Sequence, residues 1–500
     1  MRGMSLESCP NEIIHRVLYY SVLTRGLRRG LRLKLVCKFF YNALQPALFE
    51  ARVLDTIASD LCCGPGAIFK QHSARNFIGN GPHRLWHAYA VVRVSTDHDP
   101  SISRCAQVRH VAAVFSKRTG QNLDKTIAEL CWFAEGQWFE AATSNPADED
   151  PIFISDLLSA AAYFGKKALV LELLGNLPAF LDDRNLLPSP MYMAAYTGNK
   201  ELLLLFQERM PEWVGQGRVK QCDDPEWRGK ITRGSMHGAS RRGEMDIILL
   251  AMNPPSSRIK DFRDNDELRT AVWYASLGCL PPNIETFEYF RSAVGNGYYE
   301  SDIVTYASLG HMSMVRHCLD NGADPQGDMA PGRSPLSEAV RHCHWDVVDL
   351  LLERGAKIQF WAPLQDIDKS TQKRRLSSSV VVAAAQSGSL SMMRHLFDRG
   401  AVLEHPRSRR SGHLLFAGHI ALIRAVELEH TAMIDFLLEK GAGDLFRPFF
   451  KRDLSSRGER KWPLMKALEL GLESMVDVLR QNGITNESMD KDRWVIWHFD

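Results

Sequence analysis

The chain has 500 residues, of which 45% are hydrophobic and 24% are charged, and its formal net charge is +2. This length exceeds what one hydrophobic core supports, so we expect two or more units with the composition of a soluble globular protein. The near-neutral charge argues against general attraction to nucleic acid or membrane, and no apolar run reaches the ~20 residues that span a bilayer.

Ten cysteines are scattered along the chain without a CxxC pair, and the N-terminus lacks the apolar core of a signal peptide. Free thiols are therefore expected rather than a disulfide framework. The expected location is intracellular, in the cytoplasm, the nucleus or both.

Residues 6–49 predict a small helical module. Pro10 and Glu12 suit a first helical turn, and an apolar stripe of Ile13, Ile14, Val17 and Leu18 follows. After a basic linker punctuated by glycines, apolar residues recur at three- and four-residue spacing at Leu33, Val36, Cys37, Phe40 and Leu44. A segment this short and apolar would gain stability from a partner.

This segment resembles an F-box, in the patterns L-P-x-E-I-x-x-x-I-L and R-L-x-x-V-C-K-x-F-x-x-L, although Cys9 stands where Leu usually precedes the proline. The resemblance implies a three-helix module at residues 1–50 that binds the SKP adaptor of a cullin–RING ubiquitin ligase, helix against helix. The residues that it places at this contact are Pro10, Ile13, Ile14, Leu18, Leu33, Val36, Cys37 and Phe40. The alternative is an N-terminal cap on the following domain, with its apolar stripe packed inward.

Residues 51–150 contain helical segments without a repeat register, so we expect a helical linker of unknown role. The turn-rich TSNPADEDP at 143–151 marks a break before the next region.

The rest of the chain is internally repetitive. Segments such as AAAYFGKKALVLELL (160–174) and EAVRHCHWDVVDLLL (338–352) each predict a short helix with small residues, a break, and a second helix with paired apolar residues. The breaks fall at Gly165, Gly198, Gly243, Gly278, Gly310, Cys343, Gly388, Glu429 and Gly471. The gaps between them are 33, 45, 35, 32, 33, 45, 41 and 42 residues, which indicates a unit of about 33 with loop insertions.

A second glycine follows five of the breaks by 12 residues, at Gly322, Gly355, Gly400, Gly441 and Gly483. Glycine at these places supplies the left-handed residue that ends a helix. The second helix is too apolar to stand alone, so each unit must be covered by its neighbour.

The pattern resembles the ankyrin repeat, best at SPLSEAVRHCHWDVVDLLLERGAKI (334–358), where Ser334 replaces the usual Thr and Cys343 the usual Gly. The resemblance implies an ankyrin-type α-solenoid of about nine repeats at residues 151–484, with a C-terminal cap or tail at 485–500. The expected fold class is all-α.

No phosphate-binding loop, HExxH, GxSxG or kinase motif is present, so we expect no enzyme, cofactor or metal. The run RHCHWD (341–346) invites a metal interpretation, but its His and Cys are accounted for by the repeat pattern. The insertion at 211–230 carries Trp213 and Trp227, which either contact a target protein or fill a gap between repeats.

The two resemblances together predict a substrate receptor, in which the F-box binds the SKP adaptor and the ankyrin stack binds an unknown target protein. The alternative is an ankyrin-repeat scaffold without a ligase role.

Overall fold

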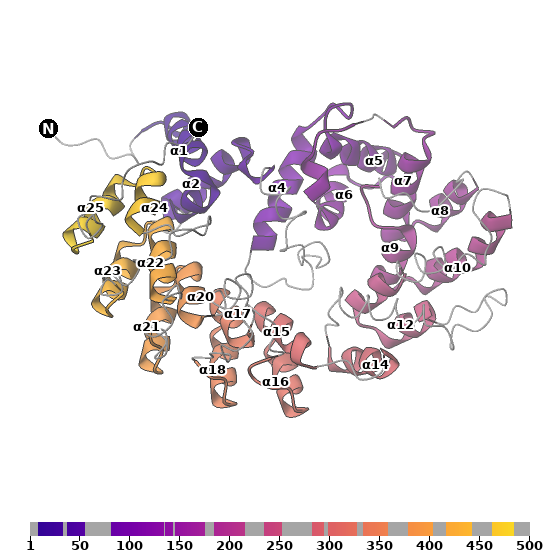
Figure 1. Ribbon diagram of the computed structural model, residues 1–500. Coiled ribbons are helices and arrows are strands. Elements are labelled where there is room, and N and C mark those ends of the chain that lie inside the picture. Colours follow the sequence, from indigo (N-terminus) through magenta and orange to yellow (C-terminus); the bar gives the residue numbers. More distant parts are fainter. Residues whose placement is uncertain are drawn as a thin grey trace, which may run out of the picture. The chain divides into compact units, whose positions relative to one another are not determined.

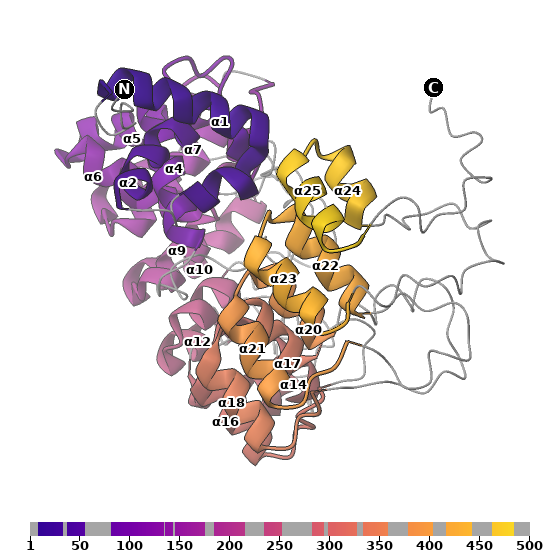
Figure 2. The ribbon, with the colours of Figure 1, turned by 90° about the vertical axis from the view of Figure 1, so that its left-hand side faces the viewer.

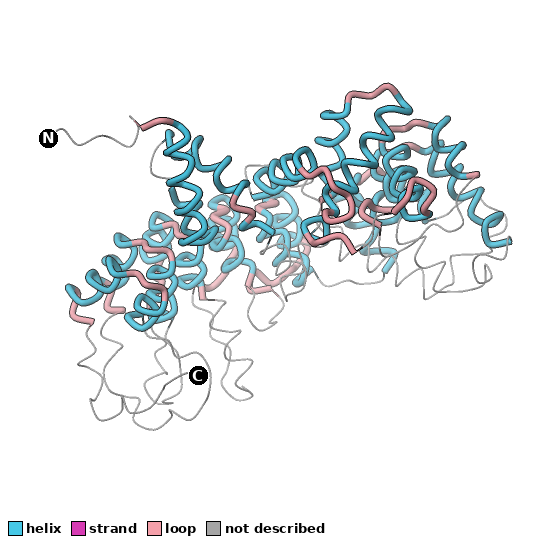
Figure 3. Tube along the Cα trace, turned by 90° about the horizontal axis from the view of Figure 1, so that it is seen from above, coloured by secondary structure: helices cyan, strands magenta, loops and turns pink. Residues whose placement is uncertain are grey.

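The computed structural model describes residues 9–33, 38–55, 82–134, 136–143, 146–175, 185–215, 235–252, 283–294, 299–327, 334–358, 379–403, 417–442 and 463–484. The chain divides into two compact units, residues 1–297 and 298–500. Within the described ranges the regular structure is helical (Figure 3). The only β-type pairing in these ranges is a single bridge between Ser103 and Ala141. The predicted all-α class, with helices packed in series, is confirmed. None of the described helices is long and apolar enough to cross a bilayer.

The second unit consists of helix pairs in two parallel rows, seen in Figures 1 and 2. The first helices of the pairs pack against one another in chain order: α15 (Tyr299–Leu309), α17 (Pro335–Arg341), α20 (Val380–Ser387), α22 (Ala417–Glu427) and α24 (Pro463–Glu469). Each packs against its own second helix: α16 (Met312–Asp320), α18 (Trp345–Glu353), α21 (Leu390–Asp398), α23 (Thr431–Glu439) and α25 (Glu473–Gln481).

The predicted breaks form the turns between the two helices of a pair. Every break residue within the described ranges has positive φ: Gly165, Gly198, Gly243, Gly310, Cys343, Gly388, Glu429 and Gly471. The following amide usually donates to the carbonyl five residues earlier, as His344 does to Ala339 at 2.9 Å. This bond satisfies a carbonyl that the end of the helix leaves unpaired.

The second glycine of each pair ends the second helix in the same way. Gly322, Gly355, Gly400, Gly441 and Gly483 all have positive φ, between 79° and 97°. The next amide again bonds five residues back, for example Ala356 to Leu351 at 2.9 Å. Since Ala323, Ala356, Ala401 and Ala442 are all buried, the turn also places a small side chain in the core.

Helix pairs also form the later part of the first unit. The first of these pairs is α7 (Pro151–Tyr163) with α8 (Lys167–Leu174), and the next is α9 (Pro190–Thr197) with α10 (Lys200–Gly215). A helix at residues 235–242 precedes α12 (Met245–Met252), and α14 (Ile284–Val294) follows. The first helix of the repeat with its break at Gly278 lies outside the described residues.

Small residues bring the first helices of these pairs close together. Ala160–Ala162 on α7 and Ala194–Ala195 on α9 are fully buried. At Gly238 a Cβ atom would lie 2.3 Å from the carbonyl oxygen of Tyr192, so only glycine fits there. The alanines of the sequence pattern therefore mark the contact between neighbouring pairs.

Residues 82–139 precede this series with α4 (Pro82–Thr96), α5 (Arg104–Thr119), α6 (Leu123–Leu130), and the short 3₁₀ helices η5 (Cys131–Phe133) and η6 (Gly136–Phe139). α5 and α6 form a further helix pair: α5 ends at Gly120, with φ of 70°, and α5 packs against both α6 and α7. The spacing of the sequence did not reveal this pair, because α5 has 16 residues where the first helices of clear repeats have seven to 13.

The N-terminal segment folds into α1 (Asn11–Arg32) and α2 (Lys38–Glu50), which pack against each other. α1 is kinked at Gly26, where φ is 73° and ψ is 171°. Its buried residues belong to the hydrophobic core that continues through residues 82–290 of the first unit. The kink divides α1 into two helical segments, so residues 11–50 contain three with α2. That these segments form an F-box stays a prediction.

Candidate functional site

α1 carries apolar side chains on two faces, of which only one is buried. Ile14, Leu18 and Val22 recur every four residues and are at most 3% exposed. They belong to the same cluster as Leu44, Ala47 and Leu48 of α2. This face accounts for the packing of the two helices.

The second face of α1 is exposed to solvent. Ile13, Val17, Tyr20 and Leu23 are 52%, 42%, 55% and 44% exposed, and they follow one another at three- and four-residue spacing. We call these four residues the α1 stripe. Contiguous exposed apolar residues on a folded helix are typical of a protein-interaction surface.

The residues predicted for adaptor contact divide between these environments. Pro10 and Ile13 are exposed, and the carbonyl of Pro10 accepts from the amide of Ile14 at 3.1 Å. Ile14 and Leu18 are buried, while Leu33 and Phe40 are partly buried and pack against the core. Val36 and Cys37 lie outside the described residues.

The sequence pattern predicted an apolar helix at these residues, and the structure divides its apolar side chains between two faces. Sequence reasoning named Ile13, Ile14, Val17 and Leu18 as one stripe and missed Tyr20 and Leu23. The available signal was two interleaved series, one from Ile14 at four-residue spacing and one from Ile13 at three- and four-residue spacing.

A partly buried ionic network joins residues 51–55, which follow α2, to α4. Arg93 of α4 donates to the carboxylates of Asp55 and Asp97, the latter at 2.9 Å. Asp97 also accepts from Arg52 at 3.1 Å, and Tyr89 donates to Asp55. Arg93 and Asp97 are both below 10% exposed, so the network holds charges that burial without partners would make costly.

Hydrogen bonds oppose burial in setting the pKa of Asp97. Burial alone would raise it, but hydrogen bonds from Arg93 and Ser103 outweigh that effect, and the pKa is lowered. Asp97 therefore stays ionised and keeps Arg93 paired. The network fixes the helix pair α1–α2 to the body of the first unit.

In the second unit, polar side chains link neighbouring first helices. The Nε of Arg341 on α17 donates to Gln386 of α20 at 3.0 Å. Glu427 of α22 lies 2.6 Å from Arg424 and 3.8 Å from Lys466 of α24. These contacts join α17 to α20 and α22 to α24 through side chains.

The structure does not describe the side chains of Trp213 and Trp227, the two candidate target contacts. Trp213 belongs to α10, but its side chain lies outside what the structure describes, and Trp227 lies outside the described residues altogether. Both stay predictions.

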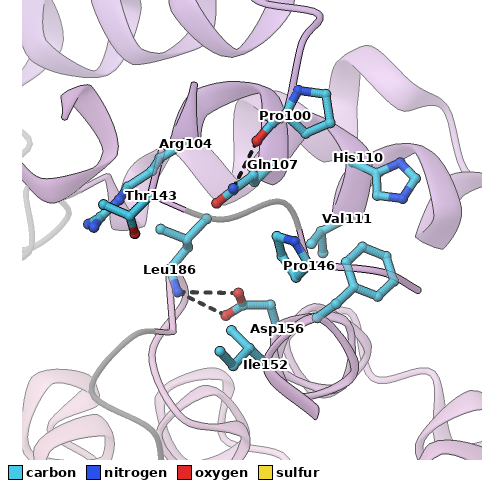
Figure 4. Close-up of a pocket in the computed structure, with 11 residues that line it drawn as sticks. Pro100, Arg104, Gln107, His110, Val111, Thr143, Pro146, Ile152, Asp156 and Leu186 are labelled. Carbon is cyan, nitrogen blue, oxygen red and sulfur yellow. Dashed lines mark hydrogen bonds between the residues drawn. The ribbon is translucent and has the colours of Figure 1, made fainter. Parts of the chain in front are cut away.

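A cavity of about 60 Å³ lies between α5 and α7 in the first unit (Figure 4). Arg104, Gln107 and His110 line it from α5, and Asp156 lines it from α7. Asp156 is 3% exposed, and its carboxylate accepts from the backbone amides of Leu186 and Leu187 at 2.9–3.2 Å. Burial, opposed by these hydrogen bonds, raises the pKa of Asp156 to about 7.

Sequence reasoning missed this cavity. The one feature of the sequence that could have indicated the cavity is the single carboxylate, Asp156, in the helix PIFISDLLSAAAY, whose other residues are mostly apolar or small. Such a residue is expected to be exposed unless it has a specific role.

His344 and Cys343 of the run RHCHWD have structural roles in the repeats. His344 lies 3.1 Å from the carbonyl of Ser308 in the preceding repeat, and its ring covers Gly310. Cys343 forms the break turn. Within the described ranges no three His, Cys, Asp or Glu side chains are grouped as a metal site would need.

Comparison with known proteins gives one family match. Residues 331–360, which contain α17 and α18, match the ankyrin repeat family model. No curated protein matches the chain. The matched segment is the one in which the sequence pattern is clearest, and its helix–turn–helix geometry recurs along the second unit. The match therefore supports an ankyrin-repeat protein, whose repeats are protein-interaction modules.

Proposed function

We propose that this chain is a substrate receptor of an SCF-type cullin–RING ubiquitin ligase, in which the α1–α2 pair binds the SKP adaptor and the ankyrin stack binds the target protein. The single observation that carries the proposal is the α1 stripe, because a helix inside a folded module keeps four large apolar side chains in solvent. The F-box resemblance of residues 6–49 supplies the identity of the partner.

The mechanism is proximity rather than chemistry on this chain. A target held on the repeats has a raised effective concentration near the ubiquitin-conjugating enzyme, so its lysines react sooner. The network around Arg93 supports this role, since it fixes the adaptor-binding pair to the unit that carries the first repeats. The chain itself would supply no acid, base or nucleophile.

The alternative is a scaffold in which α1 and α2 only cap the repeats. It is favoured by the same network and by the burial of Ile14, Leu18 and Val22, because these contacts alone suffice to hold a cap in place. The exposed stripe distinguishes the two functions, since a cap has no need of it.

Copurification with the SKP adaptor tests the proposal. Because Leu18 is 1% exposed, its replacement would damage the core, so the variant should change only exposed positions: Ile13→Ser, Val17→Ser and Tyr20→Ser together. Ile102→Ser is the matched control, since Ile102 is 68% exposed in a loop of the same unit. We expect the intact chain and the control to bind the adaptor and the triple variant to lose at least ~90% of binding. No binding by the intact chain would leave the scaffold as the function.

A further inference from the structure

The cavity between α5 and α7 has the size and lining of a side-chain binding site. Its volume of about 60 Å³ holds roughly four waters or the end of one long side chain. Val111, Ile152 and Phe153 give it apolar walls, and Asp156 stands among them with its carboxylate toward Leu186 (Figure 4). Such walls suit the methylenes of a side chain whose end is polar.

The titratable groups that line the cavity differ in whether they have an ion-pair partner. Arg104 lies 3.5 Å from Glu140, and His110 lies 2.6 Å from Asp148, so each base has its own acid. Asp156 has only uncharged donors, the amides of Leu186 and Leu187 and the side chain of Asn185, and it forms no ion pair with any described residue. The carboxylate of Asp156 is thus the charge that lacks a counter-ion.

A buried carboxylate without a counter-ion attracts a cation more strongly than an exposed one, because little water screens it. The carboxylate of Asp156 would repel an anion. A neutral ligand would leave the negative charge of this carboxylate without a counter-ion. A hard metal ion needs about six oxygen ligands, whereas apolar carbon covers much of this cavity. The ligand chemistry that remains is an alkylammonium or alkylguanidinium group.

We propose that this cavity binds the end of a lysine or arginine side chain from a partner protein, with Asp156 as its counter-ion. The proposal rests on the protein-binding role of the chain, but it does not depend on the SKP adaptor. It places a target contact in the first unit, on the helix pairs α5–α6 and α7–α8.

Titration of the full chain with n-butylguanidinium tests whether the cavity binds a cation through the carboxylate of Asp156. The amide NMR signals of Leu186 and Leu187 report the binding. We expect saturable shifts at pH 8, binding at least ~10-fold weaker at pH 5.5, and no binding by Asp156→Asn, because protonation or replacement removes the counter-ion. Equal binding of neutral butyramide, or saturation by Ca²⁺ alone, would overturn the proposal.

A second variant guards against misfolding of Asp156→Asn. Thr143 is exposed and lines the cavity, so Thr143→Trp should block it without disturbing the core. Loss of n-butylguanidinium binding in this variant, with an unchanged circular dichroism spectrum, supports the site, and retained binding contradicts it. Thr143→Trp should still bind the SKP adaptor normally if the α1 stripe is the adaptor contact. The two measurements therefore show which of the two proposals fails.

A final comparison identifies the source of the cation. The peptide acetyl-Gly-Gly-Arg-Gly-Gly-amide should bind at least as tightly as n-butylguanidinium if the site takes a side chain of a protein. Free arginine binding more than ~10-fold tighter than the peptide would instead indicate a small-molecule site and overturn the partner assignment.

Discussion

The two units reach similar helix pairs by different means. In the second unit, α16, α18, α21, α23 and α25 each have nine residues, and each is followed by a glycine of positive φ. In the first unit, α10 continues for 16 residues, and Gly175 after α8 keeps a right-handed helical conformation. Local backbone turns therefore set the length of the second helices in the second unit but not in the first.

Buried polar side chains take a larger part in the first unit. Asp156 holds the chain before α9, and the indole of Trp138 donates to the carbonyl of Leu186 at 2.8 Å. Arg93 joins two segments that lie 38 residues apart. From this comparison we expect the loss of a buried polar side chain to reduce the stability of the first unit most. Replacement of the glycines that end the second helices should reduce the stability of the second unit by similar amounts at each repeat.

The largest effect is expected for Arg93→Ala. Removal of the guanidinium leaves the carboxylates of Asp55 and Asp97 without their main partner, which should cost about 3–5 kcal/mol of stability in the first unit. Hydrogen exchange of α4 amides measures this loss. Arg118→Ala is the matched control, since its ion pair with Glu172 is exposed and should change exchange little. Equal effects of the two variants would contradict the comparison.

The next effect is the pH dependence that Asp156 contributes. Its pKa is raised from 3.8 to about 7 on folding, so its contribution to stability is full below pH 4 and is lost as the pH rises through 7. Between pH 4 and pH 8 this loss should reach a few kcal/mol. Asp156→Asn should remove this part of the dependence in urea unfolding curves of the first unit. An unchanged dependence in Asp156→Asn would show that other groups cause it.

Gly238→Ala should destabilise the contact between residues 235–242 and α9 by about 2–3 kcal/mol, because its Cβ would lie 2.3 Å from a backbone oxygen. Thermal unfolding measures the loss. The control is Gly175→Ala, whose Cβ would lie 3.6 Å from the nearest atom, at ordinary contact distance.

Gly355→Ala should cost less, about 1–2 kcal/mol, since nothing lies within 4 Å of its Cβ and only the φ of 90° opposes a side chain. Urea unfolding of the second unit measures it. A similar loss at Gly400→Ala would confirm that these turns act alike, whereas a loss at only one would contradict the uniform role of these glycines.

The smallest change has the opposite sign. Cys343 occupies a break turn at φ of 58°, where all but one of the other break residues in the described ranges are glycine, so Cys343→Gly should stabilise the second unit by about 0.5–1 kcal/mol. The midpoint of urea unfolding should rise. A fall would mean that the Cys343 side chain contributes packing that outweighs the backbone strain.

Spacing along the sequence predicted the turns better than residue type did. Cys343 and Glu429 were assigned to breaks by their place in the repeated helix–break–helix segments, and both adopt positive φ. The contacts of the first unit could not be predicted in this way. The partners Asp55 and Arg93, or Asp156 and Leu187, are separated by 38 and 31 residues, and no periodicity joins them.

The candidate site was predictable only in part for the same reason. A helix with apolar residues on two faces has the same local pattern whether one or both faces are buried. Tertiary packing against α2 decided that Ile14, Leu18 and Val22 are buried and that the α1 stripe is not.

Hydrogen–deuterium exchange of the full chain with and without the SKP adaptor tests the central claim most directly. The account predicts slower exchange of residues 11–25, which carry the α1 stripe, and unchanged exchange in α17 and α18 of the matched repeat. Unchanged exchange across residues 11–25 at saturating adaptor would contradict the proposed receptor role.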